Sequence, residues 1–171
     1  SDVCSSDLGF SPLTPVRIMD TRSGSKVGSL AIAGGASPYE LQVTGAGGVP
    51  GSGVSAVALN VTAVSTEAND YGGYVSVYPC GTVPDVSNLN FVSGQTIANS
   101  VIAPVSGSGK VCFYVYGKAH LLADVSGYFP TGFSPLTPVR IMDTRSGSKV
   151  GSLAIAGGAS PYELQVTGAG G

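Results

Sequence analysis

His120, the only histidine of the chain, shares the segment HLLADVSGYF with Asp124. A histidine beside a carboxylate is the pairing that many hydrolases use for general-base catalysis. Four residues of an extended strand span about 13 Å, so these two side chains cannot hydrogen-bond to each other in a regular strand. The sequence also contains no G-x-S-x-G nucleophile elbow. We therefore expect His120 to be a packed or surface residue, and we predict no catalytic residue and no enzymatic activity.

Four tyrosines alternate along two short segments: Tyr74 and Tyr78 in GYVSVYPC, and Tyr114 and Tyr116 in KVCFYVYG. The even spacing places the two rings of each segment on one face of a strand. Exposed rings in this arrangement would form a platform for stacking sugars, as in a carbohydrate-binding module. Alternatively, the rings fill an inter-sheet core and point their hydroxyl groups to its rim. The sequence leaves both interpretations open.

Three asparagines, Asn88, Asn90 and Asn99, lie in neighbouring predicted strands. Their amide groups can bind sugar hydroxyls, or they can satisfy loop backbone near the strand ends, which is the commoner use of buried asparagine. The sequence does not choose between these two roles.

A cluster of charges follows the segment PVRIMDTR. Asp20 lies close to Arg17 and Arg22, and an arginine here could bind an anion or a sugar. We favour a structural interpretation, in which Asp20 accepts backbone N–H groups in a turn while Arg17 or Arg22 compensates its charge.

The loop TEANDYGG offers Glu67 and Asp70 as oxygen ligands for Ca²⁺. The loop matches no recognised calcium-binding pattern, and the chain has one histidine and no C-x-x-C motif. We predict no metal site and no cofactor, and Glu67 and Asp70 remain the only calcium candidates.

Cys80 ends one tyrosine segment, and Cys112 lies near the start of the other. Both cysteines share the parity of the neighbouring tyrosines, so a disulfide between adjacent strands fits the pattern better than two unrelated buried thiols. Closing a loop of about 30 residues would stabilise the fold by roughly 3 to 4 kcal/mol. A disulfide between Cys80 and Cys112 implies an oxidising compartment, outside the cytoplasm.

The side chains named above lie in segments whose apolar and polar residues alternate, as they do in β-strands. In VSAVALNVTAVS, the apolar residues Val57, Leu59 and Val61 alternate with polar ones. About eight such segments are separated by Gly, Pro, Ser or Asn, and no stretch has the length and period of an amphipathic helix. We predict an all-β fold, an antiparallel β-sandwich of jelly-roll or immunoglobulin-like topology.

The composition excludes several classes of protein. Only 11% of the residues are charged and the net charge is −2, so no basic surface for nucleic acid is expected. With 43% hydrophobic residues the chain is not simply disordered. Its apolar runs are too short for a membrane span.

An internal repeat organises the chain. Residues 9–48 and 132–171 are identical, with an offset of 123 residues. We therefore predict a complete β-sandwich repeat over residues 9–131 and the truncated start of a second identical repeat over 132–171. Residues 1–8, SDVCSSDL, have no hydrophobic period and look like a non-native scar. The two identical segments compete for the same position in the fold, so we expect one to pack and the other to remain frayed or incomplete.

The ordered set PVRIMDTR, VALNVTAV, SVYPCG, SNLNF, ANSVIAPV, KVCFYVYG and HLLADVSGYF resembles a tandem β-repeat of secreted or cell-wall-associated actinobacterial surface proteins. The resemblance implies an extracellular or cell-wall location and a non-catalytic structural or adhesive repeat module. Its partners would be neighbouring repeats of the same chain and cell-surface polysaccharide. The alternative is a carbohydrate-binding accessory module of a secreted hydrolase.

Overall fold

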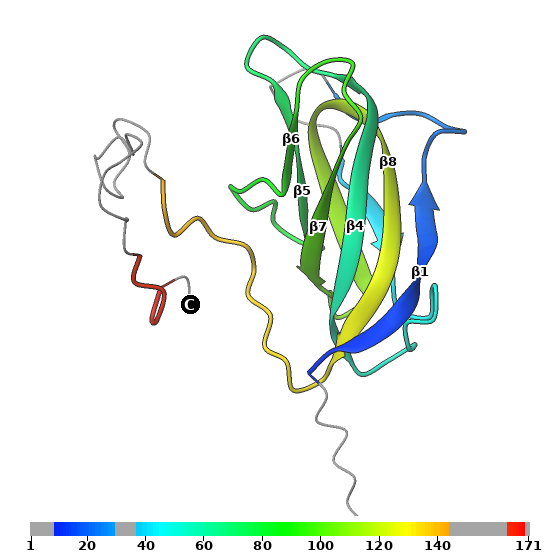
Figure 1. Cartoon of the computed structure of the whole chain (residues 1–171), viewed down its shortest axis with the longest axis vertical. Coiled ribbons are helices and arrows are strands. Elements are labelled where there is room, and N and C mark those ends of the chain that lie inside the picture. Colours follow the sequence, from blue (N-terminus) through cyan, green and yellow to red (C-terminus); the bar gives the residue numbers. More distant parts are fainter. Residues whose placement is uncertain (1–8, 30–36, 144–163, 170–171) are drawn as a thin grey trace, which may run out of the picture.

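The computed structural model describes residues 9–29, 37–143 and 164–169, so residues 1–8 lie outside it. The described residues form eight strands and no helix, and thus no helix that could cross a bilayer (Figure 1). The strands are β1 (Ser11–Asp20), β2 (Val27–Ser29), β3 (Tyr39–Gln42), β4 (Val54–Glu67), β5 (Gly73–Pro79), β6 (Leu89–Phe91), β7 (Ile97–Pro104) and β8 (Lys110–Pro130).

All strand pairs in the described residues are antiparallel, which confirms the predicted all-β antiparallel class. The strands form one sheet, ordered β6-β5-β8-β4-β7, in which β1, β2 and β3 also pair with β8. The first part of β8 lies between β3 and β5, and its last part lies between β1 and β4. The long strand β8 therefore holds the whole sheet together.

The continuity of β8 differs from the sequence expectation, which divided it into KVCFYVYG and HLLADVSGYF. Gly117 lies at the division with a φ of 95°. A Cβ atom there would come within 2.5 Å of the Glu67 carbonyl oxygen, so only glycine fits. The pairing with β2 and β4 shifts register beside this point. Gly117 therefore acts within the strand, at an irregularity of the kind that bends a sheet, and does not end it.

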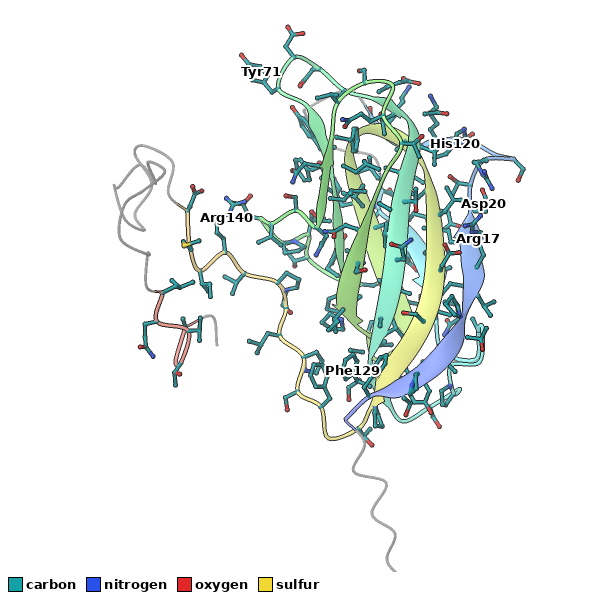
Figure 2. All side chains as sticks on the ribbon, in the orientation of Figure 1. Arg17, Asp20, Tyr71, His120, Phe129 and Arg140 are labelled. Atoms are coloured by element: carbon teal, nitrogen blue, oxygen red, sulfur yellow. A yellow bond between two sulfur atoms is a disulfide. The ribbon has the colours of Figure 1, made fainter. Side chains whose placement is uncertain are left out.

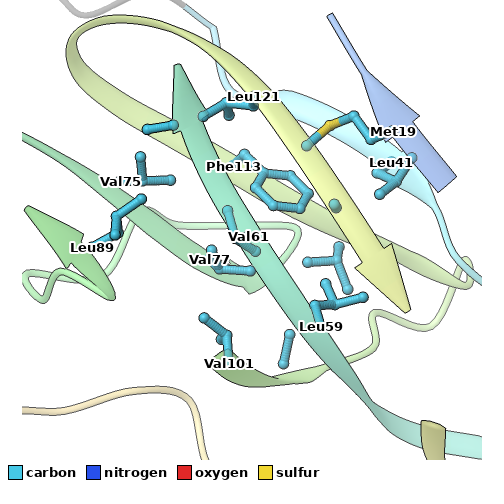
Figure 3. Packing of buried hydrophobic residues seen from close by; sticks show 14 of the residues in the cluster. Met19, Leu41, Leu59, Val61, Val75, Val77, Leu89, Val101, Phe113 and Leu121 are labelled. Atoms are coloured by element: carbon cyan, nitrogen blue, oxygen red, sulfur yellow. The ribbon is translucent and has the colours of Figure 1, made fainter. Parts of the chain in front are cut away.

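The core gathers side chains from all eight strands, some of which Figure 3 shows. In β4, Val57, Leu59, Val61 and Ala63 are buried while the residues between them are half-buried, which confirms the predicted alternation. Val75 and Val77 of β5 and Phe113 of β8 join the same cluster. Burial of this apolar surface is the main stabilising contribution to the fold.

The first copy of the repeated segment, residues 9–48, contributes β1, β2 and β3 to the edge of β8. The pairing of β1 is interrupted between Pro12 and Val16, because the prolines of SPLTPV cannot donate a backbone hydrogen bond. Met19 and Leu41 from this copy reach the core.

The second copy, residues 132–171, is described over 132–143 and 164–169. Residues 134–143 and 164–169 form no strand, and residues 130–143 leave the lower end of the sheet as an extended chain (Figure 1). Met142 is 40% exposed and Val166 is 59% exposed, whereas their equivalents Met19 and Val43 are 4% and 0% exposed. The same sequence therefore has two different environments in one molecule.

Candidate functional site

The tyrosines predicted as a platform lie on the outer face of the β5–β8 pair. The strand register pairs Tyr74 with Tyr116, Ser76 with Tyr114 and Tyr78 with Cys112. Val75 and Val77, which alternate with these residues, point into the core. The tyrosines therefore lie on the face of the β5–β8 pair that points away from the hydrophobic core. Their rings do not fill the core, which Val75 and Val77 occupy on the other face.

Tyr78 is fully buried on this outer face. The loop after β5 folds back onto the strand beside it: Ser76 Oγ donates to the Val86 carbonyl, and the Val77 amide donates to Asn88 Oδ1 at 2.7 Å. Burial raises the pKa of Tyr78, and its hydroxyl has no hydrogen-bond partner among the described residues. Tyr78 is therefore closed to a ligand in solution.

The other three tyrosines are half-buried and touch one another. The rings of Tyr74 and Tyr116 stack at 5.3 Å with an angle of 9° between their planes. Tyr114 tilts against Tyr74 at 6.1 Å, and the Asn69 amide donates to the Tyr116 hydroxyl at 3.1 Å. Burial raises the pKa of Tyr74. The stack forms a fixed aromatic wall.

Beside this wall lies an open groove of about 520 Å³. Its lining includes Tyr71, Tyr74, Asn90, Gln95 and Tyr116. Tyr71 is 94% exposed at the rim of the groove (Figure 2). The groove combines aromatic faces with amide groups, which is the chemistry that binds a sugar ring.

The predicted disulfide is present: the Sγ atoms of Cys80 and Cys112 lie 2.16 Å apart. Cys112 faces Tyr78 across the β5–β8 pair, and Cys80 follows the end of β5. The bridge ties the residue that follows β5 to the central strand β8.

A second polar cluster lies along β1, at the opposite side of β8 from β4. Asp20 accepts hydrogen bonds from the Arg22 amide at 3.0 Å and from Arg22 Nε at 2.9 Å. These contacts lower the pKa of Asp20 to about 2. Arg17 donates through two nitrogens to the two carboxylate oxygens of Asp124, at 2.8 and 3.1 Å. Each carboxylate of the cluster is therefore paired with an arginine from this chain.

His120 lies near this cluster but is not bonded to Asp124, whose carboxylate binds Arg17 (Figure 2). The nearest polar partner of the ring is Thr21, with 3.4 Å between Oγ1 and Nδ1. Thr21 Oγ1 also accepts the Leu121 amide at 2.9 Å, so this hydroxyl is part of the β1–β8 junction. Among the described residues, the Thr21 hydroxyl is the hydrogen-bond partner of the His120 ring.

Of the two calcium candidates, Glu67 and Asp70, the carboxylate of Glu67 is already bonded to a lysine. Glu67 pairs with Lys26 at 2.5 Å, and this contact lowers its pKa. Asn69, which lies between Glu67 and Asp70, accepts the Tyr71 amide at 3.0 Å. Among the described residues no group of three or more His, Cys, Asp or Glu side chains could hold a metal ion.

The three asparagines have different environments. Asn88 bonds the backbone of β5, and Asn99 Nδ2 donates to the Asn88 carbonyl at 2.6 Å. Asn90 pairs with Tyr74 across β5 and β6 and is exposed at the groove. Only Asn90 of the three lines the groove.

Tyr71 and Gln95 line the groove but are not among the site residues predicted from the sequence. Tyr71 follows a loop with no periodicity, and Gln95 precedes β7 in a turn. Their only sequence signal is an aromatic ring or an amide within a segment rich in Gly and Ser. Their proximity arises because β6 pairs with β5 and brings both loops together.

No protein-family model, no curated protein and no solved structure matches this chain.

Proposed function

We propose that this chain is a non-catalytic extracellular structural or adhesive repeat module, built to be joined in tandem. The observation that carries the proposal is the junction between copies. β8 ends at Pro130, and the repeated sequence starts again two residues later, at Gly132. A following unit would therefore begin where this one closes, with almost no linker.

The proposed fold is a β-sandwich of two layers that share β8. What supports it is that β4 and β5 do not pair with each other, yet Val61 of β4 and Val77 of β5 belong to one core cluster. Side chains from two unpaired strands meet in this way when one part of a sheet packs over another. Jelly-roll and immunoglobulin-like topologies both remain part of the proposal.

The disulfide supports an extracellular or cell-wall location, because such bonds persist in oxidising compartments. The chain contains three cysteines, and Cys80 with Cys112 accounts for two of them. Maleimide labelling under denaturing, non-reducing conditions should therefore add one label per molecule after export to an oxidising compartment. Three labels after export would contradict this location.

The tandem role is tested with a protein of three joined units. We expect its largest dimension in small-angle X-ray scattering to grow by a constant increment from one to two to three units. We also expect its thermal midpoint to remain that of one unit, because each unit has its own core. A compact scattering profile that does not lengthen with added units would contradict the proposal.

The groove at Tyr71 favours a second candidate, a carbohydrate-binding accessory module. Its supporting observation is the nearly fully exposed Tyr71 ring beside the Tyr74–Tyr116 stack and the Asn90 amide. Co-sedimentation with insoluble cellulose, chitin and peptidoglycan tests it. Tyr71→Ala should weaken retention roughly 2- to 10-fold if a sugar stacks here.

Tyr39→Ala is the matched control, because Tyr39 is a partly exposed tyrosine on β3, away from the groove. Equal loss in both variants, or no retention of the unaltered protein, would leave the structural module as the function.

A further inference from the structure

The edge of β8 that holds β1 is a defined docking edge, residues 122–128. The pairing runs from Ser11 opposite Tyr128 to Asp20 opposite Leu122. The Phe10 ring lies over Gly127, where a Cβ atom would come within 2.2 Å of it. The docking edge is therefore specific for one segment. At one end of that segment the Phe10 ring needs the missing side chain of Gly127, and at the other end the Met19 side chain enters the core.

The second copy of that segment follows the docking edge directly. If Ser134 took the position of Ser11 opposite Tyr128, residues 129–133 would be the loop of a β-hairpin. Five-residue hairpin loops are common. A turn is already present here, since the Phe133 amide donates to the Pro130 carbonyl at 3.3 Å and Gly132 has a φ of 112°.

Equivalent residues of the two copies already meet at the same anchor. Phe10 packs against Phe129 with ring centroids 5.1 Å apart, and Phe133, its equivalent in the second copy, stacks on Phe129 at 4.3 Å. Phe129 closes the lower end of the sheet, where β1 begins and the C-terminal chain departs (Figure 2). The second copy therefore starts next to the position that its first aromatic ring would have to fill.

We propose that the docking edge binds residues 134–143 of the same chain in exchange with β1, as the second strand of a hairpin with β8. Identical side chains make identical contacts: Met142 replaces Met19 in the core, and Arg140 replaces Arg17 on Asp124. Residues 49–171 contain every position of the 123-residue repeat once, as residues 9–131 do. The exchanged state is thus a circular permutation of the same fold, which shares residues 49–131.

The test places a charge in one copy at a time of the full chain. Met19→Asp puts a carboxylate in the core position of the first copy, and Met142→Asp is the matched control in the second. After limited proteolysis, N-terminal sequencing identifies the surviving core. Intact mass cannot do so in the unaltered chain, because residues 9–131 and 49–171 have the same composition.

We expect the Met142→Asp core to begin near residue 9 and the Met19→Asp core to begin near residue 49, in a monomer. The double variant should lose the protected core altogether. A Met19→Asp core that still begins near residue 9, or a Met19→Asp protein with no protected core, would overturn the exchange. Protection of the second copy only in a dimer would overturn the hairpin and place the strand in a neighbouring chain.

Discussion

Residues 9–48 and 132–171 have the same sequence, and the residues described in both copies differ in structure. In the first copy Met19 is buried and Arg17 is bonded to Asp124, whereas in the second Met142 is exposed and Arg140 lines a small pocket with Asp85 beside β5. Val43 is fully buried and Val166 is more than half exposed. The copies share every local propensity, so the difference comes from which of them pairs with β8.

The strands of the first copy, β1, β2 and β3, are held by tertiary pairing. β1, β2 and β3 each pair with β8, and none of the three pairs with another. A segment without β8 beside it has no partner for its backbone groups, and an isolated strand is not stable in water. The second copy, over its described residues, is the same chain without that partner.

The largest effect is expected where both copies depend on the same residue. Phe113 of β8 is fully buried in the core that residues 49–131 contribute to either arrangement. Phe113→Ala should lower the free energy of unfolding by about 3 to 5 kcal/mol, measured by urea denaturation. Val92→Ala, at an exposed position, is the control and should change it by less than about 0.5 kcal/mol. A loss below about 1 kcal/mol in Phe113→Ala would mean that Phe113 does not belong to the core that stabilises the fold.

The disulfide is also common to both arrangements. Replacing Cys80 and Cys112 together by Ser should lower the free energy of unfolding by about 2 to 5 kcal/mol. The loss should be the same in a chain that also carries Met142→Asp, because the bridge joins only shared residues. Thermal denaturation with and without reductant measures it, and a protein insensitive to reductant would contradict the prediction.

A smaller effect on the free energy of unfolding is expected from equivalent substitutions in the two copies. Val43→Ala removes fully buried methyl groups and should cost about 1 to 3 kcal/mol, while Val166→Ala should stay within about 0.5 kcal/mol. If the copies exchange, Val166 can take the place of Val43, so the loss of unfolding free energy in Val43→Ala is limited. The double variant should then lose more unfolding free energy than the two single variants together. Strict additivity of the two losses would contradict exchange.

The smallest effect concerns the charges on β1. The Arg22 hydrogen bonds hold the pKa of Asp20 at about 2, below its ordinary value of 3.8. This contribution to stability is present above pH 3.8 and is lost as the pH falls through about 2. Carboxyl chemical shifts in an NMR titration should show Arg22→Ala raising the pKa of Asp20 towards 3.8. Arg140→Ala, in the second copy, should leave it unchanged.

Much of the fold could be predicted from local patterns. The alternation in β4 was enough to identify a strand and its buried face, because side chains alternate across any sheet. The shared parity of cysteines and tyrosines predicted the bond between Cys80 and Cys112. The continuity of β8 could not be predicted from local patterns, because a glycine within such a segment usually marks a turn. Gly117 instead lies inside the strand, where its missing side chain allows the Glu67 backbone to come close.

The candidate site was less accessible to such reasoning. Parity places Tyr74 and Tyr78 on one face, and they do share it, but Tyr78 is fully buried whereas Tyr74 lies beside a groove. Tyr71 and Gln95 meet through the β5–β6 pairing. Neither the covering of a side chain such as Tyr78 nor the approach of two loops follows a period along the chain. The sequence therefore carries no direct signal for either.

Local patterns along the chain predict the strand period, favour the Cys80–Cys112 bond and reveal two identical segments for one position beside β8. The pairing of β1, β2 and β3 with β8 shows which of the two segments occupies that position. Two identical segments have identical propensities and could make identical contacts, so nothing local distinguishes them. They differ in chain connectivity, since one copy leads into β4 through residues 43–53 and the other follows the end of β8.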